Sequence, residues 1–159
     1  MGDRRESGTI AIVPTYVVRA PEGLLPTDAR APLAAAVTRA HAAVTGAPRS
    51  FAQVFVEEFA PGRHFIGGEP ADPATLFVLG YVRGGRSAQM LQDLAGAVRD
   101  AVVSVAEVAD DQVWVYVHDM PPDRMIEFGR VLPAAGDEAD WIAALPDPVR
   151  ERLERLDRG

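Results

Sequence analysis

The same order of predicted elements, a strand, a helix and a second strand, occurs twice in this chain. This internal repeat restricts the fold more than any other feature. Residues 53–56 (QVFV) and 112–115 (QVWV) are its clearest echo, separated by about 60 residues, a spacing typical of duplicated structural units. In each half, strand-like alternation is followed by the apolar spacing of a helix and then by a second strand-like run. The repeat therefore predicts two βαβ units, at about 14–60 and 75–118, within a single domain spanning 14–159.

The same periodicities place the individual elements. We expect strands at 15–19, 51–59, 75–83 and 112–118, and helices at 27–45 and 87–106. Both helices carry an apolar stripe and should pack one face on a sheet. The stripes are Leu33, Val37, Ala40 and Val44 in the first helix and Leu91, Leu94, Val98, Val102 and Val105 in the second.

Capping residues refine the helix boundaries. Ser87 is a predicted N-cap, and Gly46 followed by Pro48 should end the first helix. Pro32 falls beyond the first turn counted from Thr27, where it would remove a backbone hydrogen bond. We therefore expect a kink or a later helix start there.

Two βαβ units with right-handed crossovers build a four-stranded mixed sheet with both helices on one face, an α+β arrangement within the wider α/β class. The last strand alternates between valines, which suit helix packing, and a set made of Trp114, Tyr116 and His118, which suits a subunit interface or a pocket. A loop at 119–133 and a short charged helix at about 137–156, packed on the outside, should complete the domain.

Composition excludes several classes of function. The net charge of −7, from 16 basic and 23 acidic residues, argues against nucleic-acid binding. The chain has no cysteine, and its three histidines lack metal-ligand spacing, so neither a thiol nucleophile nor a metal site is expected. Apolar runs are too short to cross a membrane, and residues 1–13 lack the apolar core of a secretory signal, so we expect a cytoplasmic protein without membrane partners.

Arg83 and Arg86 bracket two glycines immediately before Ser87 opens the second helix. Two guanidinium forks beside the positive end of a helix would make a cradle for a carboxylate. The alternative is a solvated turn whose arginines pair with surface acids.

Three further side chains are candidates for a site. His41, at the edge of the first helix's apolar stripe, could bind a substrate carbonyl or carboxylate, or could be a partly buried histidine with no such role. Glu127 and Tyr116 could converge on one water as general base and orienting phenol. Otherwise Tyr116 is a packed interface tyrosine and Glu127 a surface glutamate.

Pro14 is a candidate of a different kind. An internal proline is a tertiary amide, whereas an N-terminal proline is a secondary amine that can exchange a proton near neutral pH. The many alanines and the absence of lysine indicate a GC-rich genome, in which a GTG start codon would be displayed as valine, and Val13 directly precedes Pro14. We therefore predict that residues 1–13 are an extension from a misassigned start and that Pro14 is the native N-terminus.

On a doubled βαβ pattern, these six residues resemble the tautomerase superfamily, specifically its cis-3-chloroacrylic acid dehalogenase subgroup. The likeness runs from about residue 14 to 145. It is carried by Pro14, His41, Arg83, Arg86, Tyr116 and Glu127 and by the segments at 40–41, 45–46, 65–68, 85–87, 113–116, 127–130 and 132–133.

The resemblance implies a tautomerase (MIF-like) fold, a homotrimer, and an N-terminal proline at the base of each pocket. It implies that Arg83 and Arg86 hold the carboxylate of a 3-haloacrylate, and that His41 helps to bind and polarise it. Neither a metal nor an organic cofactor is implied.

The resemblance also assigns the chemistry. Glu127 and Tyr116 would activate water for attack at C3, and protonated Pro14 would deliver a proton to C2. Loss of halide would then give malonate semialdehyde.

Two alternatives stay open at this point. The chain could be a hydratase or tautomerase of another small unsaturated or 2-oxo acid. If Pro14 is not N-terminal, it could instead be a non-catalytic trimeric binder.

Overall fold

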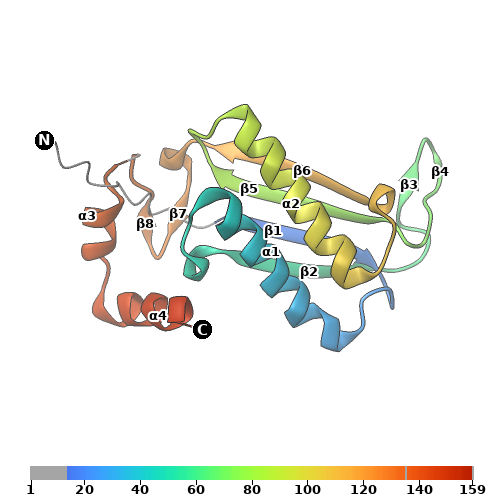
Figure 1. Cartoon of the computed structure of the whole chain (residues 1–159), viewed down its shortest axis with the longest axis horizontal. Coiled ribbons are helices and arrows are strands. Elements are labelled where there is room, and N and C mark those ends of the chain that lie inside the picture. The colour runs from blue at the N-terminus through green and yellow to red at the C-terminus, as the bar shows by residue number, and fades with distance from the viewer. Residues whose placement is uncertain (1–13, 135, 159) are drawn as a thin grey trace, which may run out of the picture.

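A four-stranded mixed sheet forms the centre of the computed structural model, which describes residues 14–134 and 136–158 (Figure 1). Its strands are β1 (Thr15–Pro21), β2 (Gln53–Phe59), β5 (Leu76–Arg83) and β6 (Val113–Met120), in the order β2-β1-β5-β6. β1 is parallel to β2 and antiparallel to β5, and β5 is parallel to β6. The predicted pair of βαβ units in an α+β fold is confirmed. The predicted extension at 1–13 lies outside the described residues.

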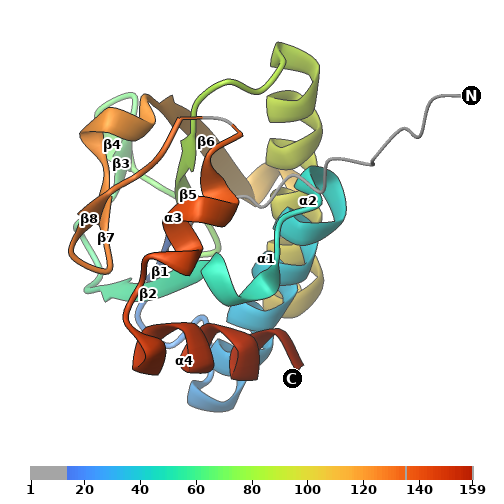
Figure 2. The ribbon, with the colours of Figure 1, turned by 90° about the vertical axis from the view of Figure 1, so that its left-hand side faces the viewer.

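Both crossover helices, α1 (Arg30–Thr45) and α2 (Ala88–Ala106), cover the same face of the sheet (Figures 1 and 2). The predicted late start of the first helix is confirmed: a 3₁₀ turn, η1 (Thr27–Ala29), precedes α1 and leaves Pro32 in the first α-helical turn, where a missing N–H costs little.

Both predicted caps are also confirmed. The Ser87 hydroxyl accepts a hydrogen bond from the N–H of Met90. Gly46 ends α1 in the left-handed conformation that glycine adopts without strain, and its N–H donates to the carbonyl of Ala42.

The main core lies between the sheet and these helices. Apolar side chains at every second strand position meet the helix stripes, and all of the following are buried: Tyr16, Val18, Ala20, Leu33, Val37, Leu76, Val78, Val82, Leu94, Val98 and Val102. On β6, Val113, Val115 and Val117 pack on this core, as their alternation predicts.

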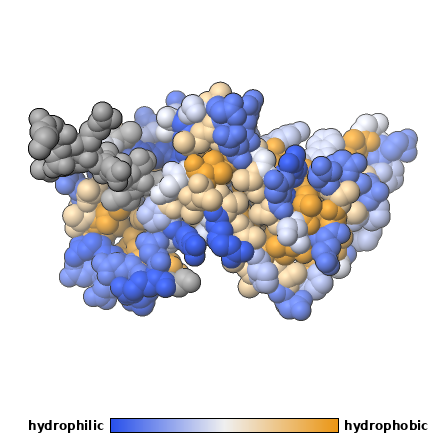
Figure 3. Space-filling view, viewed as in Figure 1, coloured by the Kyte–Doolittle hydropathy of each residue, from blue (hydrophilic) through white to orange (hydrophobic). Residues whose placement is uncertain are grey.

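The opposite face of the sheet carries exposed aromatic side chains. Phe55 on β2, and Trp114 and Tyr116 on β6, are each 41–52% exposed. The two edge strands of the repeat therefore present equivalent aromatic residues to the same side. The helix-covered side, seen in Figure 3, mixes polar and apolar surface.

A short hairpin follows each of the two βαβ units. One hairpin is formed by β3 (Phe65–Ile66) and β4 (Glu69–Pro70), and another by β7 (Ile126–Glu127) and β8 (Arg130–Val131). Further 3₁₀ turns are η2 (Arg49–Phe51), η3 (Asp110–Gln112) and η4 (Pro122–Arg124). The expectation of a simple loop at 119–133 was therefore wrong: Phe128 and Gly129, both at positive φ, turn the chain back on itself there.

The C-terminal segment forms two helices, α3 (Glu138–Ala143) and α4 (Asp147–Arg158), and not the single predicted helix. Pro146 separates them because it has no N–H to continue a helix and it disfavours helical geometry at the residue before it. A second, small core of Phe51, Leu145 and Leu153 fixes this segment to η2. No helix within the described ranges has the length and apolarity needed to span a membrane.

Candidate active site at the end of the sheet

One end of the sheet gathers five of the six predicted site residues. β1 starts there, while β5 ends there at Arg83, beside Met120 of β6. Pro14, immediately before β1, is buried, and its carbonyl accepts the N–H of Gln53 at 3.0 Å. α1 returns to this end with His41 near its C-terminus, and α2 leaves from it. The hairpin β7–β8 and α3 also lie at this end (Figure 1).

His41 is held by Tyr16, which projects from β1 into the helix–sheet core. The Tyr16 hydroxyl oxygen lies 2.7 Å from Nδ1 of His41, and both side chains are almost fully buried. Burial, followed by the positive charge of Arg86, lowers the pKa of His41 to about 4. Burial also raises the pKa of Tyr16, with Arg86 opposing the shift. Near neutral pH both side chains are therefore uncharged.

Arg86 is half-buried and interacts electrostatically with both members of this pair. Its Nη1 donates to the backbone carbonyl of Arg83. Burial is the largest influence on Arg86 and lowers its pKa. Tyr16 and the exposed carboxylate of Asp119 raise this pKa, whereas the charge of Arg83 lowers it. The guanidinium remains charged at neutral pH because it starts from the high pKa of arginine. The folded chain thus places Arg86 near both Arg83 and the Tyr16–His41 pair.

Arg83 has a partner that sequence reasoning missed. Its Nη1 lies 2.5 Å from Oε1 of Glu138, and its Nη2 donates to the carbonyl of Pro133 at 3.0 Å. The second oxygen of Glu138 accepts the N–H of Gly136 at 2.8 Å. Burial alone would raise the pKa of Glu138, but the hydrogen bonds from Arg83 and the backbone, together with the charge of Arg83, lower it overall. The pair is therefore ionised, with both side chains less than 10% exposed.

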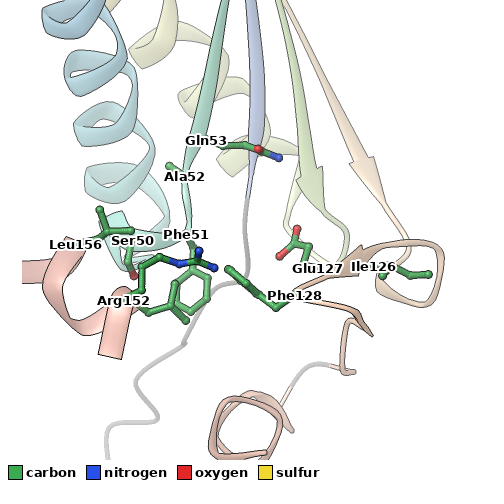
Figure 4. Close-up of a pocket in the computed structure, with 10 residues that line it drawn as sticks. Ser50, Phe51, Ala52, Gln53, Ile126, Glu127, Phe128, Arg152 and Leu156 are labelled. Carbon is green, nitrogen blue, oxygen red and sulfur yellow. The ribbon is translucent and has the colours of Figure 1, made fainter. Parts of the chain in front are cut away.

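Glu127 lies on β7 in a pocket of about 390 Å³ between the hairpin, η2 and α4 (Figure 4). Gln53 and Phe128 line this pocket with it, and the guanidinium of Arg152 stacks 5.8 Å from the centre of the Phe128 ring. An adjoining hollow contains Glu127, Gln53 and Thr15. Since Thr15 directly follows Pro14, this hollow reaches the start of β1.

Tyr116 is the predicted residue that the folded chain keeps apart from the others. In the sheet register it pairs with Leu79, four positions before Met120 at the end of β6. At about 3.3 Å per residue, this places it about 13 Å along the strand from the site. It faces the open side, 52% exposed, with its ring packed edge-on against Phe77 at 5.1 Å.

Two residues of this site, Tyr16 and Glu138, were not among the predicted ones. Tyr16 could have been found as the polar member of an otherwise aliphatic, helix-facing alternation. Glu138 offered no local signal, because its partner lies 55 residues away in sequence.

Comparisons with known proteins show which family and fold this chain resembles. Residues 13–144 match a family model described as a putative oxalocrotonate tautomerase enzyme. The solved structure of N1, described as a member of the cis-3-chloroacrylic acid dehalogenase family, is 33% identical, with a TM-score of 0.83 over 89% of this chain and 99% of N1. No curated protein sequence matches the chain.

Two further solved structures share the fold. Native Ps01740 is 29% identical, with a TM-score of 0.66 over 71% of this chain and 99% of that one. The F6 fused 4-OT, described as a wild-type asymmetric trimer, is 20% identical, with a TM-score of 0.69 over 74% of this chain and 94% of its own.

Proposed function

Because this chain belongs to the tautomerase superfamily, within its cis-3-chloroacrylic acid dehalogenase-like group, we propose that it is a cofactor-independent enzyme acting on a small unsaturated monocarboxylic acid. The proposed reaction adds water across the double bond of a 3-haloacrylate, with loss of halide, to give malonate semialdehyde. Arg83, Arg86 and His41 would bind the acid, and Glu127, Tyr116 and Pro14 would carry the proton transfers.

The observation that supports this most is a set of buried, cationic and hydrogen-bonding groups with unused donors. Nε2 of His41 and Nε of Arg83 are buried and make no hydrogen bond to any residue in the described ranges. A buried donor without an acceptor costs roughly 1 to 3 kcal/mol, so a bound acceptor at these two atoms would stabilise the folded protein. A carboxylate supplies the acceptors that these donors lack.

The neutral state of His41 gives it a defined role. We assign the Tyr16 hydroxyl as the donor to Nδ1, which leaves the proton of the neutral ring on Nε2. His41 would then donate from Nε2 to a substrate oxygen and would not serve as the general base. Charge that builds up on the carboxylate during attack at C3 would be stabilised by Arg86 and by this N–H.

In the proposed mechanism, Glu127 takes a proton from a water molecule while the oxygen of that water bonds to C3. The ammonium form of an N-terminal Pro14 gives a proton to C2. The carbon–halogen bond of the resulting adduct then breaks while its hydroxyl loses a proton, forming the aldehyde. A free α-amine titrates at about 7.7 to 8.0 when unperturbed, so near pH 7 an N-terminal Pro14 would be mainly in the ammonium form that this step needs.

Assembly would bring Tyr116 to the reaction. We propose a homotrimer, because the F6 fused 4-OT neighbour is a trimer. Phe55, Trp114 and Tyr116 form an exposed aromatic face that assembly would cover. In this arrangement a site would receive Tyr116 of the partner subunit, since Tyr116 of the same chain lies too far along β6.

A second candidate is keto–enol tautomerisation of a small 2-oxo acid, which the description of the matching family favours. That reaction needs the Pro14 amine and the cationic groups but no water activated by Glu127. Loss of activity in Glu127→Gln would therefore separate hydration from tautomerisation.

The test is product analysis of purified protein beginning at Pro14, supplied with cis-3-chloroacrylate, propiolate or a small 2-oxo acid. We expect chloride and malonate semialdehyde from the first and malonate semialdehyde from the second. Turnover of only the 2-oxo acid would favour the tautomerase. Carboxylate binding without any turnover would leave a binding protein.

A further inference from the structure

We propose that Glu138 is a built-in counter-ion that neutralises Arg83 and so makes the site selective for substrates with a single carboxylate. This proposal rests on the carboxylate site proposed above and specifies which acids that site accepts. The two arginines are not equivalent in the structure, because Arg83 already pairs with a carboxylate of its own chain, that of Glu138.

The pair is constructed so that a ligand cannot readily displace it. Both terminal nitrogens of Arg83 are engaged, one by Glu138 and the other by the Pro133 carbonyl. Glu138 is held from its other side by the Gly136 N–H. Exposure of the two side chains is only 6% and 9%. A substrate that displaced Glu138 would leave a buried carboxylate without a cation, which is a costly state.

Among the described side chains of this cluster, the remaining charges then sum to one free cation. Arg83 and Glu138 cancel, His41 is neutral near pH 7, and Arg86 keeps its charge. Asp119 also acts on Arg86, but it is exposed and therefore screened by water. In the proposed mechanism the Pro14 ammonium and the Glu127 carboxylate offset each other, so one carboxylate balances this cluster, whereas a second would enter a buried region with no cation left to pair with it.

Arg83 keeps a role in binding despite its partner. Its buried Nε–H has no acceptor among the described residues, so it can donate one hydrogen bond to the bound acid. Glu138 is thus a positioning and charge-setting residue that acts through Arg83, and it does not itself touch the substrate.

The experiment is calorimetric titration of the full chain at pH 7.5 with acrylate and with maleate, which differ by one carboxylate. We expect the wild-type protein to bind acrylate at least about tenfold more tightly than maleate, the scale of one hydrogen bond to a charged group. Glu138→Gln keeps an oxygen acceptor but removes the charge, and should shift the maleate-to-acrylate affinity ratio towards maleate by about tenfold or more.

Two variants control for structural effects. Glu138→Asp keeps the charge and should keep the wild-type preference, and Glu151→Gln, exposed on α4, should leave both affinities unchanged. Circular dichroism establishes that each variant is folded.

The outcomes separate the two proposals. Equal weakening of both ligands in Glu138→Gln would show a structural role only and overturn the inference. Wild-type protein that binds maleate as tightly as acrylate would also overturn it, even if Glu138→Gln failed to fold. Wild-type protein that binds neither acid would instead count against the proposed carboxylate site.

Discussion

Tyr16 on β1 and His41 on α1 share a 2.7 Å hydrogen bond across the helix–sheet interface, and both side chains are at most 1% exposed. The bond joins the first strand to the first helix at the end of the sheet where Pro14 and the arginines lie. It holds the imidazole in one orientation and keeps a polar pair inside an otherwise apolar core.

Tyr16→Phe should destabilise the protein by about 1 to 2 kcal/mol, because Nδ1 of His41 loses its partner in a buried position. Urea unfolding at pH 7 measures this directly. Tyr81→Phe is the matched control, since Tyr81 packs on His118 on the open face and should change stability by less than about 0.5 kcal/mol. Equal effects in the two variants would contradict the importance of the buried bond.

The depressed pKa of His41 predicts that stability falls on acidification. Above pH 6.5 neither the folded nor the unfolded state protonates this ring. Between pH 6.5 and about 4 the unfolded state binds a proton that the folded state does not, so the free energy of unfolding should fall by up to about 3 kcal/mol. Below that range the contribution of His41 levels off.

Unfolding midpoints in urea from pH 7.5 to 4 test this slope. His41→Gln should flatten the part of the slope due to residue 41, whereas His118→Gln, at an exposed position, should leave it unchanged. A wild-type slope retained in full by His41→Gln would assign the acid sensitivity to other groups.

Substitution of Arg83 should lower stability, whereas substitution of Arg86 should lower activity. Arg83→Ala leaves Glu138 buried without its cation and should lower stability by about 3 to 5 kcal/mol. Arg86→Ala should leave the fold largely intact but lower kcat/KM about ten- to over a hundredfold, from the loss of a charged hydrogen bond to substrate. Arg86→Lys should recover only part of this, since an ammonium cannot reproduce the guanidinium fork.

Thermal unfolding and steady-state kinetics separate these effects. Arg99→Ala on α2, where Arg99 pairs with Asp100 on the surface, is the control for general loss of charge. Unchanged kcat/KM in Arg86→Ala would exclude Arg86 from substrate binding.

Glu127→Gln should lower the rate of water addition by about 10² to 10⁴, because it removes a general base while changing volume little. Halide release from cis-3-chloroacrylate is the readout, and size-exclusion chromatography guards against a change in assembly. Glu151→Gln is again the neutral control. Near-normal turnover in Glu127→Gln would assign the base to another residue.

Much of the fold could be predicted from the sequence because its signals are periodic and local. The repeat gave four strands and two helices, and Ser87 and Gly46 marked helix ends through their own chemistry. The hairpins were missed because strands of two residues, such as Ile126–Glu127, carry no period. Pro146 could have predicted the break between α3 and α4. The charged residues on both sides of it favoured a single helix instead.

The site was less predictable because its decisive contacts join distant segments. Arg83 and Glu138 meet only through the way the chain after β8 folds back over the end of β5. Tyr16 follows the alternation of an ordinary core residue. Its hydrogen bond could not be predicted, because the bond depends on where α1 places His41 over β1. Tyr116 lies on the face predicted for it, yet its distance from the other residues depends on register between strands.

The central proposal is a cofactor-free reaction at a free Pro14 amine, and one comparison of rates tests it most directly. Halide release from cis-3-chloroacrylate should be measured for protein whose first residue is Pro14 and for the chain that begins at Met1, in which Pro14 is an internal tertiary amide, both at pH 7.5 with folding verified. We expect kcat of the chain that begins at Met1 to be lower by about 10² or more, the usual scale for loss of an acid–base group. Equal rates in the two proteins would contradict the proposed role of Pro14.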